Sequence, residues 1–177
     1  MIPLIVTTPL PPRGPHGRPI RQLVVHCMGE YINGVSAHDA LAALNVSAHA
    51  LILPNGTIQH CVPRDQRAYH VADMNSGRLG VELLVSGDHN LKSLAAAIGW
   101  DRDAWQPMVA LPADPYTDAQ YTSLAWWLAQ EARLADLGWA AVTTHHALQP
   151  ERKFDPGPVL DWVRLERLFL IERELAA

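Results

Sequence analysis

A chain of 177 residues favours a single domain, and 49% hydrophobic against 18% charged residues is the balance of a globular protein. The formal net charge of −4 and the lack of a long basic run argue against nucleic acid as a partner. No apolar run could span a bilayer, and the amino terminus lacks the regions of a signal peptide. We therefore expect a monomer synthesised in the cytoplasm, without stable membrane association. Cys27 and Cys61 are too few for a disulfide framework, so both are expected to be reduced and buried.

The first half of the chain is predicted to contain short strands and one short helix. Residues 1–20 are expected to be an extended, proline-punctuated lead-in to a domain over residues 21–177. Arg21 to Cys27 is a β-branched apolar run, which favours a buried strand. Ser36 precedes a helix-forming sequence and can cap it. Asn55-Gly56 lies between two apolar runs and predicts a β-hairpin.

The second half adds two strands and two longer helices. Leu79 to Val85 predicts another buried strand, and the irregular residues 87–115 predict an insertion. A capping box over residues 117–120 starts a helix that is expected to stop at Gly138. A strand over residues 140–145 and an amphipathic helix over residues 159–175 complete the chain. The sequence thus predicts an α/β domain with one central mixed β-sheet flanked by α-helices.

Two titratable residues interrupt the predicted buried strands. His26 lies near the end of one, and Glu82 lies in the middle of the other. His26 could be a hydrogen-bonded core histidine, and Glu82 could form a structural ion pair with an arginine such as Arg78. Alternatively, a strand carboxylate that faces a polar cleft can have a raised pKa and act as a general base.

A third cluster lies between His145 and Gly157, where a histidine doublet is followed by Lys153 and Asp155. Two histidines and a carboxylate suit zinc and leave a fourth position for water. Asp155 could instead only cap the last helix, and Lys153 could be a solvated surface lysine. Spacing alone therefore indicates a metal site without deciding it.

Five segments carry a resemblance to a known family. They are LVVHC (23–27), VSAHALILPNGTIQHCVP (46–63), RAYHVADMNSGRLGVEL (67–83), YTDAQY (116–121) and THHALQPERKFDPGP (144–158). In this order they resemble the zinc-dependent N-acetylmuramoyl-L-alanine amidases. That family includes phage amidase-type lysozymes, muropeptide-recycling amidases and, more distantly, peptidoglycan recognition proteins. The resemblance implies the peptidoglycan-recognition-protein-like amidase fold.

The resemblance also implies roles for individual residues. One Zn²⁺ ion would be held by His26, His145 and Asp155. His145 is preferred to His146 because the family places its lysine eight and its carboxylate ten residues after the histidine, as Lys153 and Asp155 are placed here. Glu82 would be the acid/base, and Lys153 would stabilise the oxyanion.

Two further positions match the family's motif near the substrate cleft. His70 and Asn75 are therefore expected to bind substrate. Relatives that use a catalytic tyrosine carry it at the position of Ala48, so the resemblance implies the glutamate mechanism instead.

The implied activity is hydrolysis of the amide between N-acetylmuramic acid and L-alanine, with peptidoglycan or a muropeptide as the partner. We expect a phage or prophage endolysin, released through a holin-type pore, because the insertion with Trp100 and Trp105 is longer than a recycling enzyme needs. The alternatives are a cytosolic anhydro-muropeptide-recycling amidase and a non-catalytic peptidoglycan-binding module. A zinc peptidase that cuts within the stem peptide is a further possibility.

Overall fold

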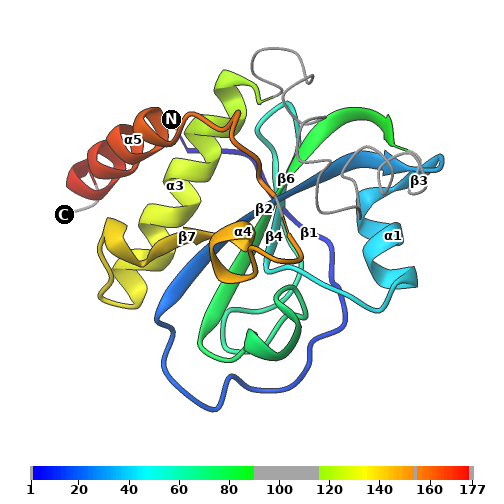
Figure 1. Cartoon of the computed structure of the whole chain (residues 1–177). Helices are drawn as coiled ribbons and strands as arrows, with labels where there is room; N and C mark the ends of the chain where they lie inside the picture. The colour runs from blue at the N-terminus through cyan, green and yellow to red at the C-terminus, as the bar shows by residue number, and fades with distance from the viewer. Residues whose placement is uncertain (1, 90–115, 154, 176–177) are drawn as a thin grey trace.

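A mixed β-sheet forms the centre of the computed structural model, which describes residues 2–89, 116–153 and 155–175 (Figure 1). The strands run in the order β1-β5-β4-β6-β2-β3, and β7 also pairs with β2. Their bounds are β1 Ile5–Thr7, β2 Gln22–Ile32, β3 Val35–Ser36, β4 Ala50–Ile52, β5 Ile58–His60, β6 Arg78–His89 and β7 Val142–Thr144. The helices are α1 Ala37–Ala43, α3 Asp118–Leu134, α4 His145–Leu148 and α5 Trp162–Leu175, with 3₁₀ turns η1 Ala72–Met74 and η3 Trp139–Ala141. The predicted α/β class and the mixed sheet are confirmed.

The two predicted buried strands form the parallel pair at the centre of the sheet. β2 and β6 pair over most of their length, and both extend several residues beyond the predicted strands. Their register sets His26 directly beside Glu82, with Leu51 of β4 on the other side of Glu82. Paired residues of neighbouring strands project from the same face of a sheet, so His26 and Glu82 share a face.

That face is the one that α3 and α5 leave open. Leu23, Val25 and Val81 belong to the large core cluster, which also contains the buried faces of α3 and α5. Side chains alternate between the two faces of a strand, so His26 and Glu82 project away from those helices. In Figure 1, α3 and α5 lie together on one side of the sheet and α1 lies on the other. A smaller apolar cluster around α1 covers only part of the second face.

Local turn and capping signals explain most element boundaries. Gly56 has φ +83°, as a tight hairpin between β4 and β5 requires. The Ser36 hydroxyl accepts a hydrogen bond from the Asp39 amide at the start of α1. Thr117 and Gln120 form the predicted capping box of α3.

The predicted C′ residue of α3 is wrong by two positions. The helix stops at Leu134, and Asp136, rather than Gly138, adopts the left-handed conformation with φ 53°. Aspartate tolerates this conformation better than most residues. The Leu137 amide then donates to the Ala132 carbonyl at 2.8 Å and closes the helix end before Gly138 is reached.

The lead-in and the start of the insertion both contribute to the sheet, which the sequence did not predict. Residues 5–7 of the lead-in form β1, which joins the sheet edge by parallel pairing with β5. Strand β6 includes the first residues of the predicted insertion, and residues 90–115 lie outside the described residues.

Neither cysteine is in a disulfide; Cys61 is buried, whereas Cys27 is only partly buried. In the part of the chain that the structure describes, no helix combines the length and apolarity needed to cross a bilayer.

Candidate metal centre

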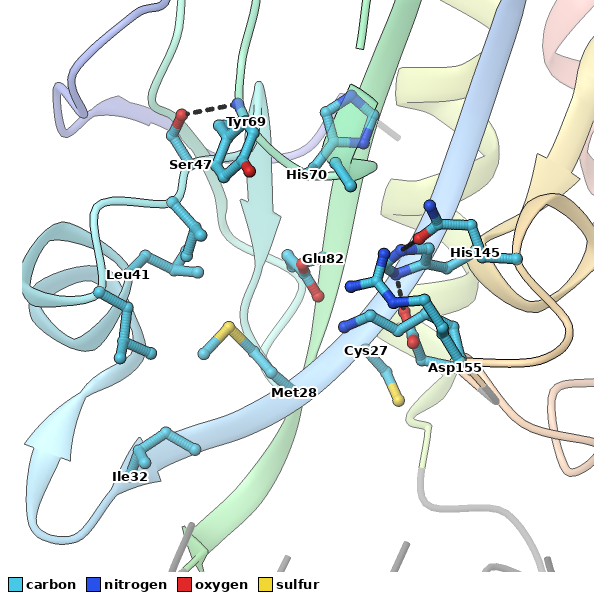
Figure 2. A pocket seen from close by; sticks show the side chains of 16 residues that line it. Cys27, Met28, Ile32, Leu41, Ser47, Tyr69, His70, Glu82, His145 and Asp155 are labelled. Carbon is cyan, nitrogen blue, oxygen red and sulfur yellow. Dashed lines mark hydrogen bonds and ion pairs between the residues drawn. The ribbon is translucent and has the colours of Figure 1, made fainter. Parts of the chain in front are cut away.

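Three side chains that are distant in sequence converge at the open face of the sheet. His26 comes from β2, His145 begins α4, and Asp155 lies in the segment before α5. His26 Nδ1 lies 2.8 Å from His145 Nδ1 and 3.1 Å from Asp155 Oδ2, and His145 Nδ1 lies 3.0 Å from the same oxygen. All three side chains are buried. Figure 2 shows His145 and Asp155 together on one side of a cleft.

The triangle of donor atoms fits a zinc ion. Ligands about 2.0–2.1 Å from a tetrahedral zinc lie roughly 3.3 Å apart, close to the three observed distances. A point above such a triangle can therefore be at ligand distance from all three atoms. Without a cation, no placement of one proton on each ring satisfies all three contacts: if both Nδ1 atoms donate to Asp155, their two N–H groups oppose each other at 2.8 Å, and if either does not, two lone pairs face each other. The donor set therefore suits a divalent cation.

The electrostatics of the cluster favour its metal-binding protonation state. Burial lowers the pKa of His26, although Asp155 acts in the opposite direction. Burial alone would raise the pKa of Asp155, but the hydrogen bonds from His145 and His26 outweigh it and hold that pKa below its ordinary value. A neutral imidazole beside an ionised carboxylate is the form that a metal ion requires.

The short helix α4 directs the two side chains of the histidine doublet to different surroundings. The Thr144 hydroxyl accepts a hydrogen bond from the Ala147 amide and caps α4. Consecutive residues of a helix point in directions about 100° apart. His145 thus faces Asp155, whereas His146 Nδ1 lies 2.8 Å from the Lys153 carbonyl oxygen, to which it can donate. His145, rather than His146, belongs to the cluster.

Glu82 lies next to this cluster, and no arginine of the described residues forms an ion pair with it. Its Oε1 is 4.0 Å from His26 Nδ1, and its Oε2 is buried and has no hydrogen bond from any described residue. Arg78 donates instead to the Gln22 side chain and to the Met74 carbonyl, so the alternative of a structural ion pair between Arg78 and Glu82 is not formed. Burial, reinforced by Asp155, raises the pKa of Glu82 from 4.5 to about 8, while Lys153 acts in the opposite direction. A carboxyl group in this state can both take up and release a proton near neutral pH.

A cleft of about 290 Å³ gives access to these groups. One wall is apolar and includes Met28, Ile32 and Leu41, while His145 and Asp155 lie opposite and Glu82 lies between the two walls (Figure 2). Lys153 and Arg152 also line the cleft, so Lys153 is not a remote surface lysine. The arrangement provides a metal position, a proton acceptor and a cation around one open space.

The two predicted substrate residues have different surroundings. His70 lines the cleft, and its Nδ1 lies 2.9 Å from His26 Nε2. Burial, with the neighbouring histidines, lowers the pKa of His70 well below 6.5. Asn75 is buried, and its Oδ1 accepts hydrogen bonds from the His70 and Val71 amides, both at 2.8 Å. Asn75 therefore organises the loop that carries His70 and borders a neighbouring hollow.

One residue of the site was missed at the sequence level. Gln149 lines the cleft, and its Oε1 lies 3.2 Å from His145 Nε2. The signal was the spacing of four residues between His145 and Gln149, which places two side chains on one helical face. That spacing is too common to stand out before the metal ligand is known.

Comparisons with known proteins agree with this geometry. Residues 16–158 match the family model described as N-acetylmuramoyl-L-alanine amidase. The chain belongs to this family. One relative is the 1,6-anhydro-N-acetylmuramyl-L-alanine amidase AmpD of Salmonella typhimurium (strain SL1344). It is 33% identical over 132 residues, covering 72% of this chain and 59% of that relative. This amidase-family chain thus spans about three fifths of the length of its curated relative.

Solved structures show the same fold. A crystal structure of an AmpD derivative superposes with a TM-score of 0.68 at 27% identity, covering 95% of this chain and 96% of that one. The endolysin amidase LysCS of Clostridium intestinale gives a TM-score of 0.60 at 16% identity, covering 94% and 95% of the two chains. The predicted amidase fold is therefore confirmed. Because both kinds of amidase share it, the fold does not discriminate between them.

Proposed function

We propose that this chain is a zinc-dependent amidase that hydrolyses the bond between the lactyl group of N-acetylmuramic acid and L-alanine. The observation that carries the proposal is the convergence of His26, His145 and Asp155 next to the buried Glu82 in one open cleft. Family membership supports the same reaction. In this proposal residues 21–177 are the catalytic domain, and residues 1–20 are the lead-in that contributes β1 to the sheet.

One zinc ion is the proposed cofactor, held by His26 Nδ1, His145 Nδ1 and Asp155 Oδ2. When bound, such an ion lowers the pKa of a water ligand to about 7 and polarises a substrate carbonyl. Three protein ligands leave a position for water, as catalytic zinc sites require.

The side chains of the cleft move the proton and hold the developing charge. We assign to Glu82 the proton that the attacking water loses, since its pKa of about 8 suits uptake and release near neutral pH. Glu82 then returns this proton to the alanine nitrogen as the amide bond breaks. The ammonium group of Lys153, in the same cleft, stabilises the oxyanion. His70 and Asn75 are proposed to contact or shape the substrate side of the cleft.

The proposed substrate is a soluble anhydro-muropeptide. The curated relatives are named for a 1,6-anhydro-N-acetylmuramyl substrate. This favours the recycling role over the endolysin role that the sequence led us to expect. The argument for an endolysin rested on an insertion that falls mostly outside the described residues. A holin-type release is therefore not part of the proposal.

Two other functions are less well supported. A binding module without activity would not need a buried carboxyl group next to a full set of ligands. A peptidase that cuts within the stem peptide could use the same metal chemistry, so only the products distinguish it from an amidase.

The test compares products and substrates. Purified, zinc-supplemented protein is incubated with anhydro-muropeptide and, separately, with intact sacculi, and the products are identified by mass spectrometry. We expect a free stem peptide that begins with alanine, formed much faster from the soluble substrate. The Asp155→Ala variant is the control and should form none.

Each other outcome has a definite meaning. Fragments cut within the stem peptide would identify a peptidase, and unchanged substrate would identify a binding module. Faster digestion of sacculi would restore the endolysin role. Equal activity of the Asp155→Ala variant would refute the metal mechanism.

A further inference from the structure

Both histidines of the proposed zinc site have their second ring nitrogen near a possible acceptor. His26 Nε2 lies 2.9 Å from His70 Nδ1, and His145 Nε2 lies 3.2 Å from Gln149 Oε1. Neither contact involves the atoms that face the metal position, since both histidines turn Nδ1 toward Asp155. Each contact thus lies on the side of the imidazole ring that faces away from the proposed metal position.

Proton counting assigns the direction of these two hydrogen bonds. A neutral imidazole carries one proton, so a ring that offers Nδ1 to a metal must keep its proton on Nε2. That N–H then needs an acceptor. The amide oxygen of Gln149 can only accept, and His70 Nδ1 accepts when the His70 proton is on Nε2. Gln149 therefore favours the tautomer in which His145 leaves Nδ1 free. His70 supports the same tautomer of His26 when its own proton is on Nε2, a buried atom that has no hydrogen-bond partner among the described residues and is left to a water or substrate in the cleft.

The fold holds the His70 ring in the place where it can act as an acceptor. Gly80 lies on β6, and a Cβ atom added there would be 2.4 Å from His70 Nδ1. The ring also meets His49 edge-on at a centroid distance of 5.7 Å, and His49 Nδ1 accepts a hydrogen bond from the Gly80 amide. The Asn75 oxygen fixes the His70 backbone. Gly80, His49 and Asn75 thus fix the position of His70 Nδ1, the proposed acceptor.

We propose that His70 and Gln149 are positioning residues that fix the tautomer and the orientation of the two histidine ligands, and so set the affinity of the site for zinc. The inference rests on the proposed metal site and adds to it a role for His70 besides substrate contact. Neither residue touches the metal or the reacting atoms in this role. Loss of such an outer hydrogen bond typically costs about 10- to 100-fold in metal affinity.

The test uses pairs of variants that keep or remove the acceptor. His70→Asn keeps an amide oxygen near the position of Nδ1, whereas His70→Leu does not. Gln149→Glu keeps an oxygen, whereas Gln149→Met has a similar shape without one. His60→Leu is the matched control, because His60 is also partly buried but does not line the cleft. The zinc dissociation constant is measured by competition with a chromophoric chelator.

We expect zinc affinity to fall about 10- to 100-fold in His70→Leu and Gln149→Met. It should be largely retained in His70→Asn and Gln149→Glu, and unchanged in His60→Leu. Rescue by the acceptor-bearing variants distinguishes positioning from a mere loss of packing. Equal affinity of His70→Leu and the wild type would overturn the role of His70.

A second measurement needs no variant. In the zinc-loaded wild type, two-bond ¹H–¹⁵N correlation spectra report which nitrogen of each histidine carries the proton. We expect Nε2–H in His26, His145 and His70; a proton on Nδ1 of His70 would refute the inference even if the His70 variants do not fold. If the wild type binds no zinc at all, the proposed function itself is refuted. That result differs from a wild type that binds zinc while the variants or the tautomers contradict the positioning role.

Discussion

Glu82→Gln should change how the stability of the metal-free protein depends on pH. The pKa of Glu82 is about 8 in the folded protein and 4.5 ordinarily, and its side chain is buried. The folded state therefore holds a proton that the unfolded chain releases above pH 4.5. Stability then falls as pH rises from about 4.5 to 8 and levels off above that range. Glutamine has no proton to lose, so the variant should lack this component.

The size of the effect follows from the two pKa values. Each pKa unit corresponds to about 1.4 kcal/mol, so the gap between 4.5 and about 8 amounts to about 5 kcal/mol at pH 9. Native domains are stable by only about 5–15 kcal/mol. The burial of Glu82 is thus a substantial stability cost that the wild type carries at alkaline pH.

Urea unfolding of metal-free protein at pH 5 and pH 9 measures the effect. We expect the wild type to lose several kcal/mol between the two pH values relative to Glu82→Gln. Glu174→Gln, the same change at an exposed position, should behave like the wild type. Zinc should reduce the difference, because a cation near Glu82 stabilises its carboxylate and lowers its pKa. Parallel pH profiles of Glu82→Gln and the wild type would refute a buried, protonated Glu82.

Three further variants test the other parts of the site. Lys153→Ala should lower the turnover number about 10²–10³-fold with zinc affinity unchanged, and near-normal turnover would remove the lysine from the mechanism. Asp155→Ala should lose zinc; a chelator should then lower the melting temperature of the wild type but not of this variant, since only the wild type gains stability from bound metal. Gly80→Ala should destabilise the fold by about 1–3 kcal/mol and weaken zinc binding, because the added methyl would lie 2.4 Å from His70 Nδ1. Unchanged zinc affinity in folded Gly80→Ala protein would show that the His70 ring can move without consequence.

The sequence predicted features that depend on neighbours along the chain. The Thr117 cap, the Asn55-Gly56 hairpin and the two apolar strands each rest on a few consecutive residues, and all were found. The metal cluster was predicted because a family resemblance supplied the long-range information. Residue spacing alone had left both His145 and His146 as possible metal ligands.

The features that were missed depend on side-chain contacts and strand pairings that no local sequence pattern indicates. The separation of Arg78 from Glu82 follows from its hydrogen bonds to Gln22 and Met74, which no local pattern indicates. The role of Gln149 depends on the ring orientation of His145. Strand β1 in the lead-in is only three residues long and exposed, so its sequence has no periodicity to reveal it.

The register of three parallel strands explains why the site forms where it does. Val25 pairs with Thr144 of β7, and His26 pairs with Glu82 of β6. The residue after Thr144 is His145, which therefore enters beside His26 as β7 ends and α4 begins. One row across the sheet thus runs from Glu82 on β6 through His26 on β2 to His145 at the end of β7. Because backbone hydrogen bonds fix this row, Asp155 is the one of the three proposed ligands that a loop must bring in, and the ligand set depends mainly on strand pairing.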